Sequence, residues 1–114
     1  MAIIYHNPRC GTSRTVLQIL RDRGIEPTIV LYLETPLAAS ELGELAARSG
    51  SSVRDFVRSK EALYTELGLD DPKLSDTQLL QAMAQHPVLM NRPIVVTDKG
   101  VRLCRPASVV EEIL

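Results

Sequence analysis

The sequence predicts an α/β domain in which helices cover a mixed β-sheet. Near the N-terminus, apolar runs at 2–5 and 28–33 enclose a stretch with helical spacing, the order of a β-α-β unit with parallel strands. Near the C-terminus, apolar runs at 93–97 and 101–105 flank turn residues at 98–100, which is typical of a hairpin. Hairpin strands are antiparallel, so the complete sheet is expected to be mixed.

The first third of the chain is predicted to form strand, helix and strand. Residues 2–5 (AIIY) are apolar without alternation, as in a strand buried on both faces. From Val16 to Leu20 the apolar side chains follow helical spacing, and Gly24 is expected to end this helix. The run at 28–33 (TIVLYL) is predicted to be a second buried strand.

The middle of the chain is predicted to be a block of helices. Leu42, Leu45 and Ala46 form one apolar face at helical spacing, which favours a helix that ends near Gly50. A short helix over 51–57 can begin at either of its two serines. Ser75 and Gln78 form the pattern of a capping box, which predicts a further helix ending at His86.

After the hairpin, Pro106 is expected to open a final helix with an apolar face. The full order is then β-α-β, an inserted helical block, and β-β-α, which is the plan of the thioredoxin-like fold. The chain of 114 residues contains no linker, repeat or low-complexity segment. We therefore expect one thioredoxin-like domain spanning residues 1–114.

Composition excludes some functions without choosing one. Thirteen Lys and Arg against fourteen Asp and Glu leave a net charge of −1, so no global field attracts nucleic acid or an acidic membrane. Aromatic residues make up 4%, which argues against a base-stacking platform. No apolar run approaches the roughly 20 residues of a membrane span, and residues 1–10 lack the pattern of a signal peptide. We expect a cytoplasmic protein that binds neither nucleic acid nor membrane.

Cys10 is the residue best placed for chemistry. It lies where a predicted strand ends and a helix begins, and free N–H groups at a helix start stabilise a thiolate. Gly11 is expected to let the backbone fold tightly behind the sulfur, Thr12 and Ser13 to add hydroxyl donors, and Arg14 to add positive charge. The same N–H groups suit a tetrahedral oxyanion. The alternative is a small buried hydrophobic residue, which the polar neighbours disfavour.

Two further residues bear on the chemistry of Cys10. His6, four residues before it, is a candidate for tuning its pKa, although a strand-end histidine can equally be a hydrogen-bonded structural residue. Cys104 lies in an apolar run and is expected to be packed rather than reactive. The sequence has Cys10-x-x-Ser13 instead of C-x-x-C, so an oxidised Cys10 needs an external thiol unless Cys104 reaches it in space. We therefore expect a monothiol mechanism, and no His or Cys pair has the spacing of a metal site.

Three arginines have settings that favour anion binding. Arg92 and Arg105 each precede a proline, which restricts their backbone to extended conformations, and Arg58 follows the predicted short helix. In a thioredoxin-like plan the residues before the third strand face the reactive cysteine, and the proline there is typically cis. A guanidinium group has the fork geometry that binds tetrahedral oxyanions. From spacing alone, three ordinary surface arginines remain the alternative.

Two long segments, residues 5–14 (YHNPRCGTSR) and 86–96 (HPVLMNRPIVV), contain Cys10 and Arg92. They resemble the active-site segment and the stretch around the third strand of the glutaredoxin-dependent arsenate reductases, the ArsC family. The other similar segments are 27–34, 52–54, 66–69 and 102–106. The resemblance therefore covers nearly the whole chain, and it departs at the C-terminal end, where well-known members carry a longer tail.

The resemblance implies that Cys10 attacks arsenate and forms a thiol-arsenate adduct, with no bound cofactor. Glutathione then attacks as co-substrate, and glutaredoxin completes the two-electron reduction to arsenite. Arg58, Arg92 and Arg105 fall at the family's three anion-binding arginines, and His6 at the histidine that lowers the pKa of the nucleophile. The same fold also includes glutathione-dependent thiol reductases, which act on mixed disulfides, and Spx-like regulators that bind RNA polymerase. The active-site segment and all three arginines occur together here, which favours the arsenate enzyme.

Overall fold

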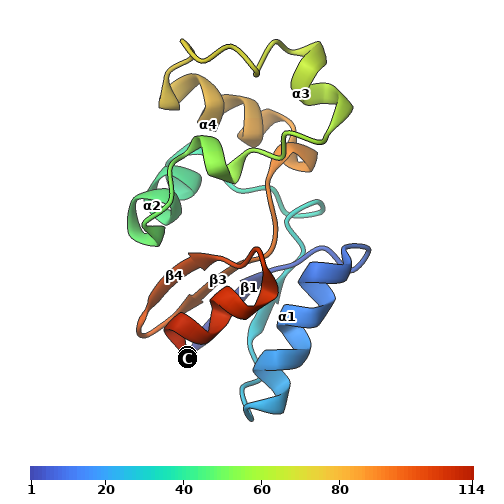
Figure 1. Cartoon of the computed structure of the whole chain (residues 1–114), viewed down its shortest axis with the longest axis vertical. Helices are drawn as coiled ribbons and strands as arrows, with labels where there is room; N and C mark the ends of the chain where they lie inside the picture. Colours follow the sequence, from blue (N-terminus) through green and yellow to red (C-terminus); the bar gives the residue numbers. More distant parts are fainter.

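The computed structural model describes all residues, 1–114, and contains a four-stranded mixed sheet with helices on both sides (Figure 1). Its strands lie in the order β2-β1-β3-β4. They are β1 (Ala2–Tyr5), β2 (Thr28–Val30), β3 (Ile94–Thr97) and β4 (Gly100–Leu103). Strand β1 pairs parallel with β2 and antiparallel with β3, which pairs antiparallel with β4. The predicted β-α-β unit and hairpin are both confirmed.

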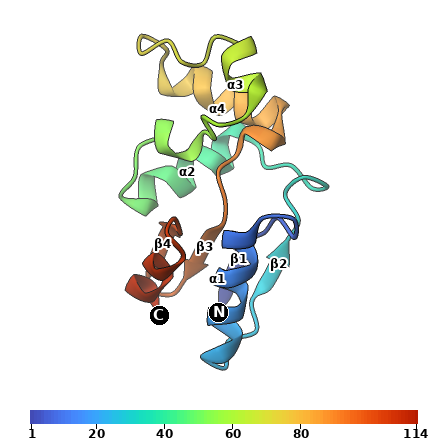
Figure 2. The same cartoon turned by 45° about the vertical axis from the view of Figure 1, so that its right-hand side comes forward.

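Helix α1 (Gly11–Asp22) and the closing 3₁₀ helix η3 (Ala107–Ile113) contact each other and cover one face of the sheet. The inserted block lies above the sheet in Figures 1 and 2, and its helix α2 contacts β4. The block consists of α2 (Ala39–Ser49), α3 (Ala62–Glu66), α4 (Asp76–Gln85) and the 3₁₀ helices η1 (Arg54–Phe56) and η2 (Pro87–Leu89).

The core consists of two apolar clusters separated by the sheet. Alternate residues of a strand point to opposite faces, and β3 shows this directly. Ile94 and Val96 join the larger cluster with the side chains of α2 and α4, whereas Val95 joins the smaller cluster under α1 and η3. Burial on both faces explains why β3 is an unbroken apolar run.

The structure corrects three of the sequence predictions. The second strand ends at Val30 instead of residue 33, because the backbone turns at Leu31, whose carbonyl accepts two hydrogen bonds. This strand is an edge strand whose Thr28 and Ile29 are exposed, so the prediction of a strand buried on both faces is wrong. The final helix is a 3₁₀ helix, and the short helix α3 was not predicted.

The topology brings distant parts of the chain to one edge of the sheet, meaning the edge formed by the ends of the strands and not by the outer strands β2 and β4. The carboxyl ends of the parallel strands β1 and β2 meet there. Antiparallel pairing places the start of β3 and the end of β4 at the same edge, since Ile94 lies opposite both Tyr5 and Leu103. The loop that follows β1 therefore faces two Arg-Pro peptides, at 92–93 and 105–106, and both are cis. The cis proline predicted before the third strand is confirmed.

Candidate active site

Cys10 is the N-cap residue of α1, as the sequence predicts. Its carbonyl accepts the first helical hydrogen bond from the Arg14 N–H at 3.0 Å, and its own N–H donates to the Asn7 carbonyl at 3.0 Å. These bonds fix the backbone on both sides of the thiol. Cys10 is buried, with an exposed fraction of 8%. The sulfur thus lies at the positive end of a twelve-residue helix.

The environment of Cys10 favours the thiolate. Burial alone raises the pKa of the thiol, but the Ser13 N–H, which donates a hydrogen bond to the sulfur, lowers it. The guanidinium groups of Arg92 and Arg105 lower the pKa further, and together these contacts bring it down to about 7. A substantial fraction of the Cys10 side chains is therefore thiolate at neutral pH.

Arg105 and Arg92 form a guanidinium pair beside the sulfur. The Nη1 atom of Arg105 lies 3.8 Å from the Cys10 sulfur and also donates to the Arg92 carbonyl at 2.9 Å. The Nε atom of Arg92 is buried and has no hydrogen-bond partner in the protein. A buried donor without a partner is costly, so the protein itself does not use the full hydrogen-bonding capacity of the Arg92 guanidinium.

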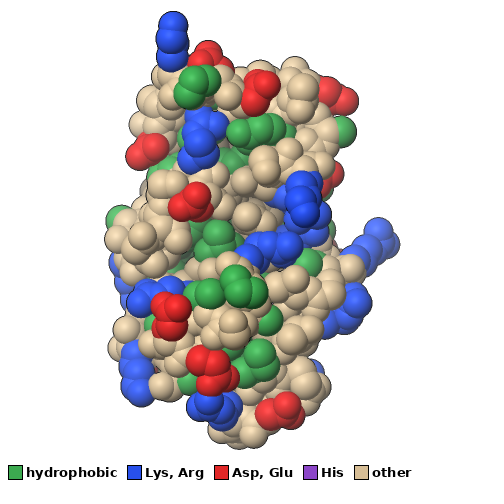
Figure 3. Space-filling model, viewed as in Figure 1, with side chains coloured by type: hydrophobic (Ala, Val, Ile, Leu, Met, Phe, Trp, Pro, Cys, Tyr) green, Lys and Arg blue, Asp and Glu red, His purple; other side chains and the backbone are tan.

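Arg58 reaches the same edge from the inserted block. Its N–H donates to the Leu89 carbonyl at 2.7 Å, next to a bridge between Val57 and Met90, so the backbone of Arg58 is tied to the segment that leads to Arg92. Its side chain pairs with Glu61, with 3.5 Å between Nε and the carboxylate. Basic side chains gather where the block meets the sheet, on the side of α1 (Figure 3).

His6 is buried and contacts Ser13 rather than the thiol. Its Nδ1 lies 2.6 Å from the Ser13 hydroxyl oxygen, which also accepts the Asn7 N–H at 3.1 Å. Burial lowers the pKa of His6, and the charges of Arg21 and Arg14 lower it further. A neutral ring can accept the hydroxyl proton at Nδ1, which leaves Nε2 protonated. His6 is therefore connected to Cys10 through Ser13, whose N–H contacts the sulfur.

The remaining predicted site residues, Gly11, Thr12 and Arg14, lie in the first turn of α1 and differ in their surroundings. Apart from its two chain neighbours and the backbone of its own helix, a Cβ at Gly11 would meet only the Arg14 Nη2 atom, at an ordinary 3.8 Å. Arg14 is exposed and donates to the Pro8 carbonyl at 2.8 Å, so its side chain points to the start of the loop. Thr12 is half-buried, and its side chain has no hydrogen bond within the protein.

Sequence reasoning missed Tyr32, which lies just beyond the end of β2 and is 1% exposed. Burial raises the pKa of its phenol, and the charge of Arg92 and contact with the Asn7 side chain lower it. The Cys10 and Arg58 charges also act on this hydroxyl, which therefore borders the same site. The apolar run 28–33 concealed it, because a tyrosine there looks like an ordinary strand residue.

Cys104 is packed, as predicted. It is fully buried in the smaller apolar cluster, and burial raises the pKa of its thiol to about 12. Both cysteines are free. At neutral pH the two thiols are therefore chemically different, because only Cys10 forms a substantial amount of thiolate.

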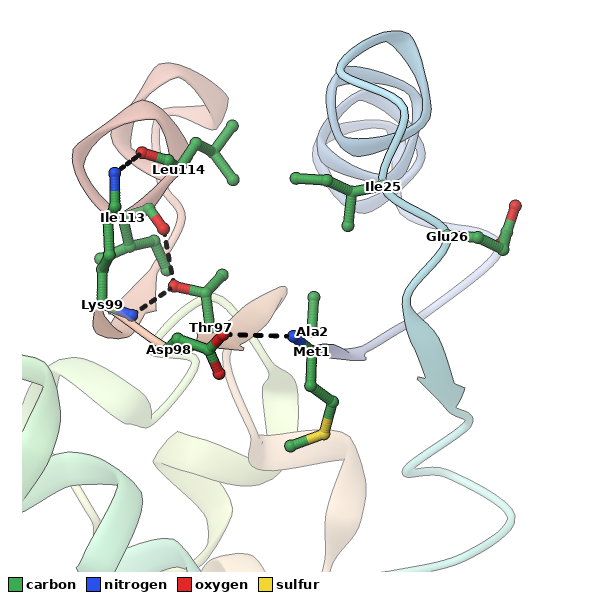
Figure 4. Close-up of a pocket in the computed structure, with 9 residues that line it drawn as sticks. All are labelled: Met1, Ala2, Ile25, Glu26, Thr97, Asp98, Lys99, Ile113 and Leu114. Atoms are coloured by element: carbon green, nitrogen blue, oxygen red, sulfur yellow. Dashed lines mark hydrogen bonds and ion pairs between the residues drawn. The ribbon is translucent and has the colours of Figure 1, made fainter.

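Other parts of the molecule are separate from these groups. A cavity of about 360 Å³ lies at the opposite end of the sheet, where Met1 and Thr97 meet beside Ile25 and Leu114, and it contains no predicted site residue (Figure 4). Nowhere do three or more His, Cys, Asp or Glu side chains converge as they would around a metal ion. None of the helices has the length and apolarity required to cross a membrane.

Comparison with known proteins identifies the family. The model of the ArsC family matches residues 5–113. An arsenate reductase of Escherichia coli is 56% identical over 111 residues, which are 97% of this chain and 79% of that protein. The chain belongs to the ArsC family. A second member, an arsenate reductase of Rhizobium meliloti strain 1021, is 53% identical over the same shares of both chains.

The ArsC fold is also seen in solved structures similar to this one. The arsenate reductase from Vibrio cholerae matches with a TM-score of 0.94 and 47% identity, over 99% of this chain and 97% of that chain. This confirms the predicted thioredoxin-like α/β fold and the family resemblance.

Proposed function

We propose that this protein is an arsenate reductase in which Cys10 is the nucleophile. One observation carries the proposal: a thiolate with a pKa of about 7 lies against two guanidinium groups, one of which has a buried N–H group without a partner. The reacting sulfur–sulfur bond of a disulfide substrate has no negatively charged oxygens for such groups. A tetrahedral oxyanion does, and the names of the 53–56% identical relatives point to arsenate.

In the first step the Cys10 thiolate attacks arsenic and displaces one oxygen. The S–As bond forms, the As–O bond breaks, and the departing oxygen takes up protons and leaves as water. Arg92 and Arg105 stabilise the remaining negative oxygens, with Arg58 as a third candidate from the inserted block. The first-turn N–H groups of Gly11, Thr12 and Ser13 lie at the helix start, where an anion is favoured.

In the following steps external thiols supply the two electrons. Glutathione adds its sulfur to arsenic and displaces a second oxygen as water. A glutaredoxin thiol then attacks the glutathione sulfur, and the mixed disulfide leaves with arsenic reduced from As(V) to As(III). Water finally releases arsenite and restores Cys10. Cys104 is fully buried, which supports a dependence on external thiols, and the reducing cytoplasm contains them.

A coupled assay tests this function. Purified protein is supplied with arsenate, glutathione and glutaredoxin, and arsenite is measured directly. We expect arsenite to form with the wild type, and to fall to background with Cys10→Ser and when glutathione is omitted. Absence of arsenite from the complete mixture, or full activity of Cys10→Ser, would contradict the proposal.

The same variants separate the two alternatives. If the protein instead reduces glutathione mixed disulfides, Arg92→Ala should lower that activity only in step with the loss of Cys10 thiolate, because the reacting disulfide bond has no tetrahedral oxyanion for the guanidinium. Arsenite formation should fall further than the thiolate does. If it is a polymerase-binding regulator, RNA polymerase should be recovered with it from a pull-down, and Cys10→Ser should not matter.

A further inference from the structure

Among the three arginines at this edge, only Arg58 forms an ion pair with a carboxylate. Its Nε lies 3.5 Å from Glu61, three residues later, and the two side chains are 22% and 32% exposed. By contrast, Arg105 donates to a carbonyl and to the Cys10 sulfur, and the Nε of Arg92 has no partner. Glu61 is thus the ion-pair partner of one of the guanidinium groups expected to bind an oxyanion.

The backbone holds this ion pair in place. The Arg58 N–H is bonded to the Leu89 carbonyl at 2.7 Å, and the Glu61 N–H to the Arg58 carbonyl at 3.3 Å. The turn therefore holds the Glu61 backbone beside that of Arg58, so the carboxylate stays within reach of the guanidinium. The Arg58 charge lowers the pKa of the buried Tyr32 hydroxyl. The charges of Cys10 and Arg92 also shift this pKa.

We propose that Glu61 is a specificity-determining residue of the oxyanion site, because its carboxylate competes with the bound anion for the Arg58 guanidinium. This inference rests on the proposed function, which makes the cluster an oxyanion site. An anion must displace Glu61 from Arg58 or share the guanidinium with it, and Glu61 also repels the anion directly. The repulsion grows with the charge of the anion, so Glu61 disfavours doubly charged more than singly charged tetrahedral anions.

Replacing Glu61 should therefore strengthen anion binding. The size of the gain should be set by the strength of the Arg58–Glu61 ion pair that is removed. Partly exposed Arg–Glu pairs are weak, so the affinity for sulfate should increase about two- to fivefold in Glu61→Gln. Perchlorate is also tetrahedral but singly charged, and its affinity should increase less. Both gains should shrink as salt is added, because ions screen half-exposed charges.

The binding is measured without turnover, through protection of Cys10 from alkylation. Iodoacetamide reacts with a thiolate, and Cys104 stays silent because its pKa is about 12. The rate of Cys10 alkylation is followed at increasing sulfate or perchlorate concentration at constant ionic strength. The concentration for half-protection gives the affinity for each anion in wild type, Glu61→Gln, Arg58→Ala and the double variant.

Glu112→Gln is the matched control, because it removes the same charge and breaks another Arg–Glu pair, between Arg102 of β4 and Glu112 of η3. Support requires tighter sulfate binding in Glu61→Gln, a smaller gain for perchlorate, a reduced gain in the Arg58→Ala background, and no gain in Glu112→Gln. Unchanged or weaker sulfate binding in Glu61→Gln overturns the proposal, as does an equal gain in the control.

The outcome is separable from that of the proposed function. Failure of the arsenite assay together with the expected sulfate results would leave Glu61 as a determinant of an oxyanion site and refute only the reduction of arsenate. Formation of arsenite with unchanged sulfate binding in Glu61→Gln would refute only the role of Glu61.

Discussion

Replacing Arg92 by Ala should raise the pKa of the Cys10 thiol and reduce the thiolate at neutral pH. The folded environment lowers this pKa from 9.0 to about 7 against the opposing effect of burial. Arg92 contributes both a hydrogen bond and a positive charge, whereas Arg105 contributes a hydrogen bond. The Ser13 N–H makes the largest single lowering contribution, and the hydrogen bond and charge of Arg92 follow it. A neighbouring opposite charge typically shifts a pKa by about one unit or more, so we expect a rise of roughly one unit in Arg92→Ala, which lowers the thiolate fraction at pH 7 several-fold.

The thiolate is followed by its ultraviolet absorbance across a pH titration. A single transition near pH 7 is expected for the wild type, since the pKa of Cys104, at about 12, lies far above the range. Arg23→Ala is the control, because it removes the same charge at the other end of α1, where Arg23 pairs with Glu111. An unchanged Cys10 transition in Arg92→Ala, or an equal shift in Arg23→Ala, would refute this reasoning.

Three further predictions concern stability and the second thiol. The pKa of Cys10 falls from 9.0 to about 7 on folding, so its thiolate stabilises the fold above pH ~9 by about 2–3 kcal/mol. This stabilisation is lost as the pH falls through about 7, and urea unfolding of Cys10→Ser should lack the dependence. Ser13→Ala leaves the Asn7 N–H and the His6 ring without their partner and should cost about 1–3 kcal/mol in the same experiment. Cys104→Ala should keep arsenite formation and cost about 1 kcal/mol; loss of activity at full stability would show that Cys104 takes part in the chemistry.

The pattern of the sequence was sufficient for most of the fold. The turn at residues 98–100 and the flanking apolar runs predict the hairpin, and its strands pair as expected. The run at 28–33 misled because Ile29 is exposed on an edge strand while Tyr32 turns inward after the strand has ended. Apolar composition alone does not distinguish these two environments.

The site was predictable where it depends on local chain geometry. The N-cap position of Cys10 follows from the end of a strand and the start of a helix, and the cis Arg92-Pro93 peptide follows from the fold plan. The path from His6 through Ser13 and the pairing of Arg58 with Glu61 depend on side-chain directions in three dimensions. Spacing along the chain brings these residues close together but does not decide which atoms meet.

The central claim is that Cys10 bonds covalently to arsenic, and mass spectrometry of the protein treated with arsenate alone tests it most directly. Without glutathione the reaction should stop at the thiol-arsenate adduct. We predict a mass increase on the peptide that contains Cys10, absent in Cys10→Ser and weaker in Arg92→Ala. Glutathione and glutaredoxin should remove the adduct and release arsenite. Arsenite formation by a protein that never carries arsenic on Cys10, or an adduct on Cys104 instead, would contradict the account.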